Sequence, residues 1–275
     1  MKVGVTRPAK YEQESVAIAN AYGFDVFYAP LISVERVWER KFKEFLQSVL
    51  RGVANLVVFM SVSSVECVFA HIHDNDPTGQ LAENFVRALN NKTTVAAVGP
   101  ATARKLESYG VSTQVLPREY SSRGLAEALM PLVKGKRVWI VRSRQGDDTL
   151  KARLEEAGAA WVQEARIYEI TPPKGDERRR AEELIMRLLA GDIEVITFTS
   201  GMCVANFFKI AEELGVKDEL IARMCNISVA AIGEPTRKKL EAHGVRVDVV
   251  PEKFTFEDMM KEVRARLKLG SKTLG

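Results

Sequence analysis

One 23-residue segment occurs twice in this chain. The first copy, VAAVGPATARKLESYGVSTQVLP, occupies residues 95–117, and the second, VAAIGEPTRKKLEAHGVRVDVVP, occupies residues 229–251. Aligned positions such as Pro117 and Pro251 are always 134 residues apart, which is about half of the 275-residue chain. An internal repeat constrains the architecture more strongly than any single motif does. The sequence therefore predicts a duplicated protein with two related halves.

The duplication extends beyond this segment. VGVTRP near the start aligns with RVWIVRS in the second half, which places Arg7 opposite Arg142, and VVFMS aligns with ITFTS. Short apolar strands alternate with amphipathic helices throughout the chain, a pattern typical of parallel sheets that are covered by helices on both faces. The sequence therefore predicts an α/β fold with doubly wound parallel sheets and about ten strands, five in each half.

The sequence allows two arrangements of the domains. The length suggests two domains of about 100–200 residues each. They are either two contiguous domains, one for each half, or two interlocked domains between which the chain crosses twice. PLISVER (residues 30–36) and RIYEITPP (residues 166–173) are long extended segments, which a paired crossover would need. The residues alone do not say which strands share a sheet.

Composition and charge exclude several classes of protein. The net charge is only +4, and no block of Lys or Arg is long enough to bind nucleic acid. We expect no membrane span, because no apolar run reaches 18 residues, and no signal peptide, because the start has no basic region followed by an apolar one. Three widely spaced cysteines (Cys67, Cys203 and Cys225) without a CxxC pattern indicate reduced thiols. These features predict a cytoplasmic protein whose ligand is an anionic small molecule.

Polar turns follow the predicted strands in both halves. Ligands of parallel α/β sheets bind beyond the carboxyl ends of the strands, and a helix that starts there offers free N–H groups to an anion. Thr102 and Thr236 stand at expected N-cap positions, so the alternative interpretation is that they only cap their helices. We expect both halves to present such turns to one ligand. The candidate residues are Arg7, Ser61, Ser63, Gly99, Thr102, Arg142, Ser200, Gly233 and Thr236.

The usual signatures of cofactor and metal sites are missing. The sequence has no GxGxxG, GxxxxGK[ST] or GxSxG motif. His71 and His73 lie with two aspartates in HIHDNDPTG, which we interpret as a solvated loop because a flexible loop does not preorganise metal ligands. The sequence therefore predicts no cofactor and no metal.

Tyr168, in the segment ARIYEI, is the one candidate acid. A tyrosine in a strand is usually a packing residue, which is the alternative interpretation. A tyrosine hydroxyl keeps its proton at neutral pH, so it can donate that proton to a departing hydroxyl group. Tyr168 is therefore the predicted catalytic residue.

Taken in order, these segments resemble the uroporphyrinogen-III synthase family. Each segment alone is weakly specific, whereas the ordered set is strongly specific and covers nearly the whole chain. The segments that carry the resemblance are VTRP, VVFMS, VAAVGPATARKLESYGV, YSSRGLAEAL, VWIVRS, EARIYEI, VITFTS and VAAIGEPTRKKLEAHGV.

The resemblance implies two flavodoxin-like α/β domains joined by a two-stranded crossover near residues 33–37 and 167–172. It selects the interlocked arrangement, with one domain formed by residues 1–34 and 171–275 and the other by residues 37–167. It also implies a monomer that needs no metal or cofactor, with a transient contact to the preceding pathway enzyme as a further partner to consider.

The implied reaction is that of a lyase in tetrapyrrole biosynthesis, the route to haem, sirohaem and cobalamin. Its substrate is hydroxymethylbilane, a linear tetrapyrrole with many carboxylates, which is closed with loss of water and inversion of ring D. Tyr168 matches the family's cleft tyrosine, and Thr102, Ser200 and Thr236 match its cleft Thr and Ser positions.

Two points weaken the match at single residues. Arg7 and Arg142 are weaker carry-overs, because either can pair with a structural carboxylate instead. The second turn reads GEPT rather than GPAT, so Glu234 adds a negative charge where carboxylates are expected to bind. The competing function is a non-catalytic module of the same fold that binds or senses a tetrapyrrole.

Overall fold

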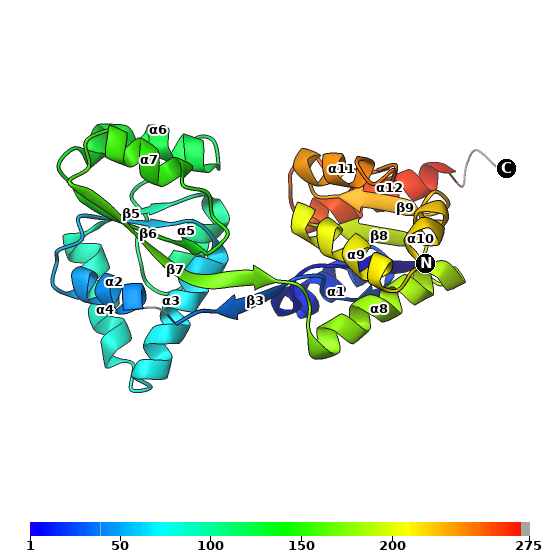
Figure 1. Ribbon diagram of the computed structural model, residues 1–275, viewed down its shortest axis with the longest axis horizontal. Helices are drawn as coiled ribbons and strands as arrows, with labels where there is room; N and C mark the ends of the chain where they lie inside the picture. Colours follow the sequence, from blue (N-terminus) through cyan, green and yellow to red (C-terminus); the bar gives the residue numbers. More distant parts are fainter. Residues whose placement is uncertain (39, 271–275) are drawn as a thin grey trace. The chain divides into compact units, whose positions relative to one another are not determined.

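A computed structural model describes residues 1–38 and 40–270 of this chain. The chain forms two compact units (Figure 1). Unit 1 contains Met1–Ser33 and the chain from Thr171 onward, and unit 2 contains Val34–Ile170. No helix in the described ranges combines the length and the apolar character needed to cross a membrane.

Unit 1 is built on a parallel sheet with the strand order β2-β1-β8-β9. An isolated parallel bridge between Ala230 and Val249 extends this order by one position. The strands are β1 (Lys2–Val5), β2 (Asp25–Tyr28), β8 (Val195–Phe198) and β9 (Ser228–Ala231).

Helices cover both faces of the unit 1 sheet because β1 is apolar on both sides. Val3 and Val5 pack in one cluster with residues of α1 and α12, whereas a Cβ placed on Gly4 would lie 2.8 Å from Leu184 of α8. The helices of the unit are α1 (Glu12–Ala21), α8 (Gly175–Ala190), α9 (Gly201–Glu213), α10 (Lys217–Met224), α11 (Glu234–Glu241) and α12 (Phe256–Gly270), with a 3-10 turn η1 at Ala9–Tyr11.

Unit 2 contains a five-stranded sheet with the order β3-β7-β6-β4-β5, in which the β7-β6-β4-β5 pairs are parallel. A parallel bridge between Ala96 and Val115 again adds one position. The strands are β3 (Ser33–Arg36), β4 (Leu56–Phe59), β5 (Thr94–Ala97), β6 (Arg137–Ser143) and β7 (Trp161–Thr171).

Helices lie on both faces of the unit 2 sheet (Figure 1), and alternate strand residues pack against different helix layers. Val57 and Phe59 of β4 join the cluster formed with α2, α3 and α4, and Leu56 and Val58 join the cluster formed with α6 and α7. The predicted α/β class with parallel sheets is confirmed. The helices are α2 (Arg40–Leu50), α3 (Val62–Asn75), α4 (Gln80–Lys92), α5 (Pro100–Glu107), α6 (Ser122–Val133) and α7 (Thr149–Glu156).

The sequence repeat accounts for both strand orders. Strands β1, β2, β8 and β9 align in the sequence with β6, β7, β4 and β5, and each aligned pair occupies the same place in its sheet. Each unit therefore takes two strands from one copy of the repeat and two strands from the other. The chain passes between the units twice, within β3 and within β7.

Two local expectations were wrong. The fifth strand expected in each half pairs at a single bridge, because the side chains of Gln114 and Asp248 accept the N–H groups of Val95 and Val229 that a longer strand would use. HIHDNDPTG is not simply a solvated loop, since α3 continues to Asn75 and buries His71.

Candidate functional site

The predicted acid lies at the carboxyl edge of the unit 2 sheet. Tyr168 of β7 pairs in register with Ser143 of β6, beside an irregularity in that strand pair. Its ring is only 5% exposed and packs in the core. Its hydroxyl lies 2.8 Å from the Oγ of Ser61, which follows β4. The Tyr168 ring therefore packs in the core, whereas its hydroxyl forms a hydrogen bond with the hydroxyl of Ser61, 107 residues away in the sequence.

Ser61 also holds the start of α3. Its Oγ accepts a hydrogen bond from the backbone N–H of Ser64 at 2.9 Å, and its own N–H donates to the Ser64 hydroxyl at 3.2 Å, which forms a capping box. A serine hydroxyl has one proton to donate. Because Ser61 Oγ accepts from Ser64, its proton can point to Tyr168. The 2.8 Å contact allows either hydroxyl to be the donor, and with Ser61 as the donor the tyrosine proton is not used in this contact.

The two repeated glycine turns begin their helices without any side-chain cap. Gly99 and Gly233 are the N-caps of α5 and α11, with extended backbone at φ −170° and −173°. The prediction that Thr102 and Thr236 stand at the N-cap was wrong, because each is the third residue of its helix. A proline in each first turn fixes the backbone and lacks an N–H, so less capping is needed there.

The two threonines are nevertheless placed alike. Each is 3% exposed, and neither hydroxyl forms a hydrogen bond with the part of the chain that the structure describes. Neither hydroxyl belongs to the fully enclosed side-chain atoms that lack a partner in the described residues. The two hydroxyls are therefore not sealed inside the fold, and a ligand at the turn can pair with them.

Glu234 does not present a free charge at the second turn. It is exposed and receives a hydrogen bond from Arg237 at 2.7 Å. This hydrogen bond lowers the pKa of the Glu234 carboxyl. The carboxylate is thus paired within α11.

Ser200 and Ser63 occupy different positions at the starts of their helices. Ser200 is the N-cap of α9, where its Oγ accepts from the N–H of Cys203 at 3.2 Å and donates to the Cys203 sulfur. Ser63 is half-buried in the first turn of α3. Both lie beyond the carboxyl ends of strands, as the sequence predicted.

The two arginines are held by their own units. Arg142 is 3% exposed, and its Nη1 lies 3.1 Å from Glu164 Oε1 on the neighbouring strand. A buried guanidinium needs such a partner, so Arg142 has a structural role in unit 2, and its predicted ligand contact stays a prediction. Arg7 donates to Ser15 at 2.9 Å and stacks on the ring of Tyr11 at 4.3 Å, so most of its surface is also occupied.

Each unit therefore gathers its own group of candidate residues at one edge of its sheet. Unit 2 brings together Tyr168, Ser61, Ser63, Gly99 and Thr102, which come from the ends of β4, β5 and β7. Unit 1 contributes Arg7, Ser200, Gly233 and Thr236 from the ends of β1, β8 and β9.

Two aromatic residues at the turns were missed in the sequence. A Cβ placed on Gly99 would lie 3.4 Å from the ring of Tyr120, and one placed on Gly233 would lie 3.2 Å from the ring of Phe254. Their 134-residue separation was a signal, because it equals the spacing of the repeat. It was overlooked because both residues follow the repeated segment.

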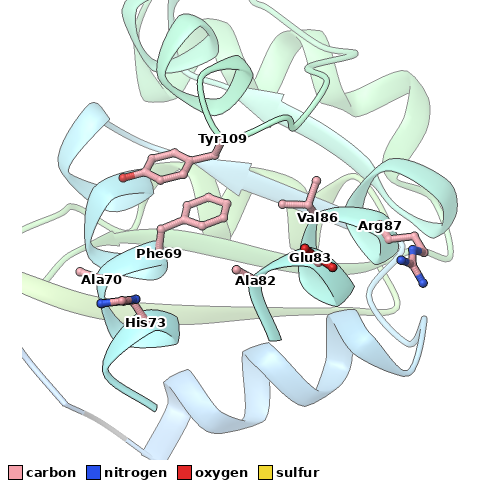
Figure 2. A pocket seen from close by; sticks show the side chains of 8 residues that line it. All are labelled: Phe69, Ala70, His73, Ala82, Glu83, Val86, Arg87 and Tyr109. Carbon is pink, nitrogen blue, oxygen red and sulfur yellow. The ribbon is translucent and has the colours of Figure 1, made fainter. Parts of the chain in front are cut away.

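A pocket of about 730 Å³ lies elsewhere in unit 2, between α3, α4 and the end of α5 (Figure 2). Tyr109 stacks on Phe69 there with ring centroids 3.9 Å apart, while His73, Glu83 and Arg87 supply the polar part of the lining. None of the predicted site residues lines this pocket. The described residues include no group of three or more His, Cys, Asp or Glu side chains that could hold a metal ion.

Comparison with known proteins connects these features to one family. Residues 13–261 match the family described as Uroporphyrinogen-III synthase HemD. A relative from Methanothermobacter thermautotrophicus, provisionally named a uroporphyrinogen-III synthase, is 33% identical over 259 residues, covering 94% of this chain and 95% of its own. The uroporphyrinogen-III synthase of Chlorobaculum parvum is 28% identical over 265 residues, covering 96% and 98%.

Solved structures agree at the level of the fold. A mutant uroporphyrinogen III synthase of Thermus thermophilus superimposes with a TM-score of 0.63 at 19% identity, covering 98% of this chain and 99% of its own. The uroporphyrinogen-III synthetase of Helicobacter pylori gives a TM-score of 0.59 at 16% identity, covering 97% and 99%. With a family match across most of its length, this chain belongs to the uroporphyrinogen-III synthase family.

Proposed function

We propose that this protein is a lyase that closes hydroxymethylbilane to uroporphyrinogen III, with loss of water and inversion of ring D, in tetrapyrrole biosynthesis. The observation that carries the proposal is the family match over residues 13–261. The polar edge of each unit supports it, because a substrate with many carboxylates needs several anion-receiving turns.

The chemistry requires one proton at the leaving group. An electron-rich pyrrole pushes out the hydroxyl of the ring A hydroxymethyl group, which leaves as water and gives an azafulvene. Ring D attacks this carbon through its substituted position and forms a spiro intermediate. The bond from ring D to the ring C methylene then breaks, and this methylene bonds the free α-carbon of ring D, which loses a proton that restores the acid and leaves ring D inverted. Tyr168 donates the proton to the departing hydroxyl, and its hydrogen bond with Ser61 orients the phenol group.

The rest of the catalytic effect comes from positioning. The N–H groups at the starts of α5 and α11, together with the unused hydroxyls of Thr102 and Thr236, bind substrate carboxylates. Ser63 and Ser200 extend these two binding edges. Holding the linear tetrapyrrole in one conformation excludes the direct closure that leaves ring D uninverted.

We further propose that the two units are flavodoxin-like domains. Numbered along unit 1, the strand order is 2-1-3-4, and the bridge of Ala230 with Val249 adds a fifth place, which matches the flavodoxin-like order 2-1-3-4-5. The domains then correspond to residues 1–34 with 171–275 and to residues 37–167, with the crossover near 33–37 and 167–172.

An isomer assay tests the function directly. Freshly made hydroxymethylbilane is incubated with the protein, the products are oxidised, and the type I and type III uroporphyrins are separated by chromatography. Spontaneous closure gives the type I isomer, so a type III product that scales with protein concentration supports the synthase. Type I alone from folded protein contradicts it and favours a tetrapyrrole-binding module.

A further inference from the structure

Tyr120 and Phe254 are the two most exposed large apolar side chains in the described part of the chain, at 63% and 71%. They occupy equivalent positions of the repeat, 134 residues apart, in loops whose local sequences otherwise differ (PREYSS and PEKFTF). Scattered single exposed apolar residues need no explanation. An exposed aromatic ring at the equivalent position of both units, in contrast, requires an explanation.

Both rings lie against the glycine turns that begin α5 and α11. Tyr120 lies over Gly99 and Phe254 lies over Gly233, with ring atoms 3.4 Å and 3.2 Å from the position that a Cβ on each glycine would occupy. Three residues after each glycine comes a threonine whose hydroxyl has no partner in the described residues. Each turn thus combines helix N–H groups, an unused hydroxyl and an adjacent open aromatic surface.

A local structural role does not account for this exposure. Each aromatic residue directly precedes a helix N-cap, since Ser121 Oγ accepts from Gly124 N–H and Thr255 Oγ1 accepts from Asp258 N–H. An apolar residue at that position often packs onto the helix as a hydrophobic staple. A staple buries its side chain, whereas these rings remain largely open to solvent.

We infer that Tyr120 and Phe254 are substrate-positioning residues, each of which contacts a pyrrole ring whose carboxylate binds the adjacent helix turn. The inference rests on the proposed function. A pyrrole is a flat, electron-rich ring, and aromatic pairs prefer offset or edge-to-face contacts with such rings. In a substituted pyrrole the carboxylate lies close to the ring. In each unit the anion-receiving turn likewise lies close to the aromatic side chain, so one pyrrole can contact both. The two rings therefore help to select the substrate conformation.

The test compares Tyr120→Ala and Phe254→Ala with two matched controls. Leu132→Ala in α6 and Met186→Ala in α8 remove exposed apolar side chains of the same two units, away from the turns. The alanine variants at the turns should raise KM for type III formation about five- to tenfold, with kcat and Tm nearly unchanged. Tyr120→Phe and Phe254→Tyr should retain the wild-type KM, and so should both controls.

A second readout separates this inference from the proposed function. Fluorescence titration with uroporphyrin III, the stable oxidised product, measures binding without turnover. Equal KM values and equal uroporphyrin affinities for the wild-type protein and both turn variants overturn the inference while the synthase assignment stands. If the wild-type protein makes only type I product, the proposed function fails, and the titration alone decides: weaker binding by the variants supports the aromatic contact, and unchanged or absent binding overturns it.

Discussion

The Tyr168→Phe substitution tests the proposed acid with the smallest possible change. It removes one hydroxyl group and keeps the ring, which is 5% exposed and packs in the unit 2 core. The hydroxyl lies 2.8 Å from Ser61 Oγ, and Ser61 keeps its capping hydrogen bond with Ser64 in the variant. The substitution therefore leaves the local fold in place.

The structure separates the expected effect on activity from that on stability. Loss of one hydrogen bond lowers the free energy of unfolding by about 1 kcal/mol. A positioned general acid contributes roughly 10²- to 10⁴-fold to the rate, so kcat for type III formation should fall by at least about 100-fold. A loss of about 1 kcal/mol in the fold does not reduce turnover to this degree in a protein that remains folded.

The repeat supplies a matched control for the Tyr168–Ser61 contact. Ser61→Ala and Ser200→Ala each remove an N-cap hydroxyl at the same place in the two units, which costs about 1 kcal/mol of stability in each case. Ser61 contacts Tyr168, whereas Ser200 donates to Cys203. Ser61→Ala should therefore lower kcat more than Ser200→Ala does at equal stability.

The assay is the initial rate of type III formation, with spontaneous type I closure measured in the same sample as an internal reference. Urea unfolding gives the stability of each variant. A Tyr168→Phe enzyme that retains kcat within about twofold would refute the acid role, because the phenylalanine ring has no proton to donate. The rate would then have to come from positioning alone.

The buried polar residues of the two units lead to three further predictions. Replacing Thr102 and Thr236 by Val should raise KM about tenfold or more with little change in the free energy of unfolding, because no hydrogen bond of the described fold is lost; an unchanged KM in steady-state kinetics would remove the threonines from the site. Arg142→Leu should lower the free energy of unfolding in urea by about 3 kcal/mol, because Glu164 keeps only its contact with Arg166; a raised KM at full stability would instead indicate a ligand contact. Burial lowers the pKa of His71 below its ordinary 6.5, with Arg36 acting in the same direction and Asp74 opposing it. The unfolded state then binds the proton more tightly, so His71 stabilises the fold fully above about pH 6.5 and progressively less as the pH falls. Urea unfolding at several pH values should show a shallower loss of stability on acidification for His71→Leu than for the wild-type protein, whereas the exposed His73→Gln control should match the wild type; equal slopes for all three would contradict the burial argument.

The fold was largely predictable because the repeat is long and keeps its register. Equivalent strands can be paired from the residues alone by their 134- to 139-residue spacing. Which strands share a sheet was not predictable from the residues, because β4 and β8 have the same apolar pattern in either arrangement. The lengths of the fifth strands were also hidden, since they depend on the side chains of Gln114 and Asp248.

The candidate site was predictable in kind but not in detail. The sequence located the polar turns, yet it assigned Thr102 and Thr236 to caps because threonine is a common N-cap residue. A preceding Gly-Pro or Gly-Glu-Pro start removes that need. Arg142 looks the same in the sequence whether it is exposed or paired, and only the structure places Glu164 beside it. His71 was misread because polar neighbours obscured the apolar face of α3.

The duplication keeps four features of the proposed binding turns and does not keep the proposed acid. Both copies keep the glycine turn, the unpaired threonine, the capping serine and the exposed aromatic ring, although the turns differ at Glu234. The position that aligns with Tyr168 is Ser33, whose hydroxyl donates to Glu177. Many carboxylates and several pyrroles must be held, which two sets of similar turns can do, but only one hydroxyl leaves. The proposed reaction suits a duplicated binding surface with a single proton donor, and the two copies in this chain differ in that way, with Tyr168 in one and Ser33 in the other.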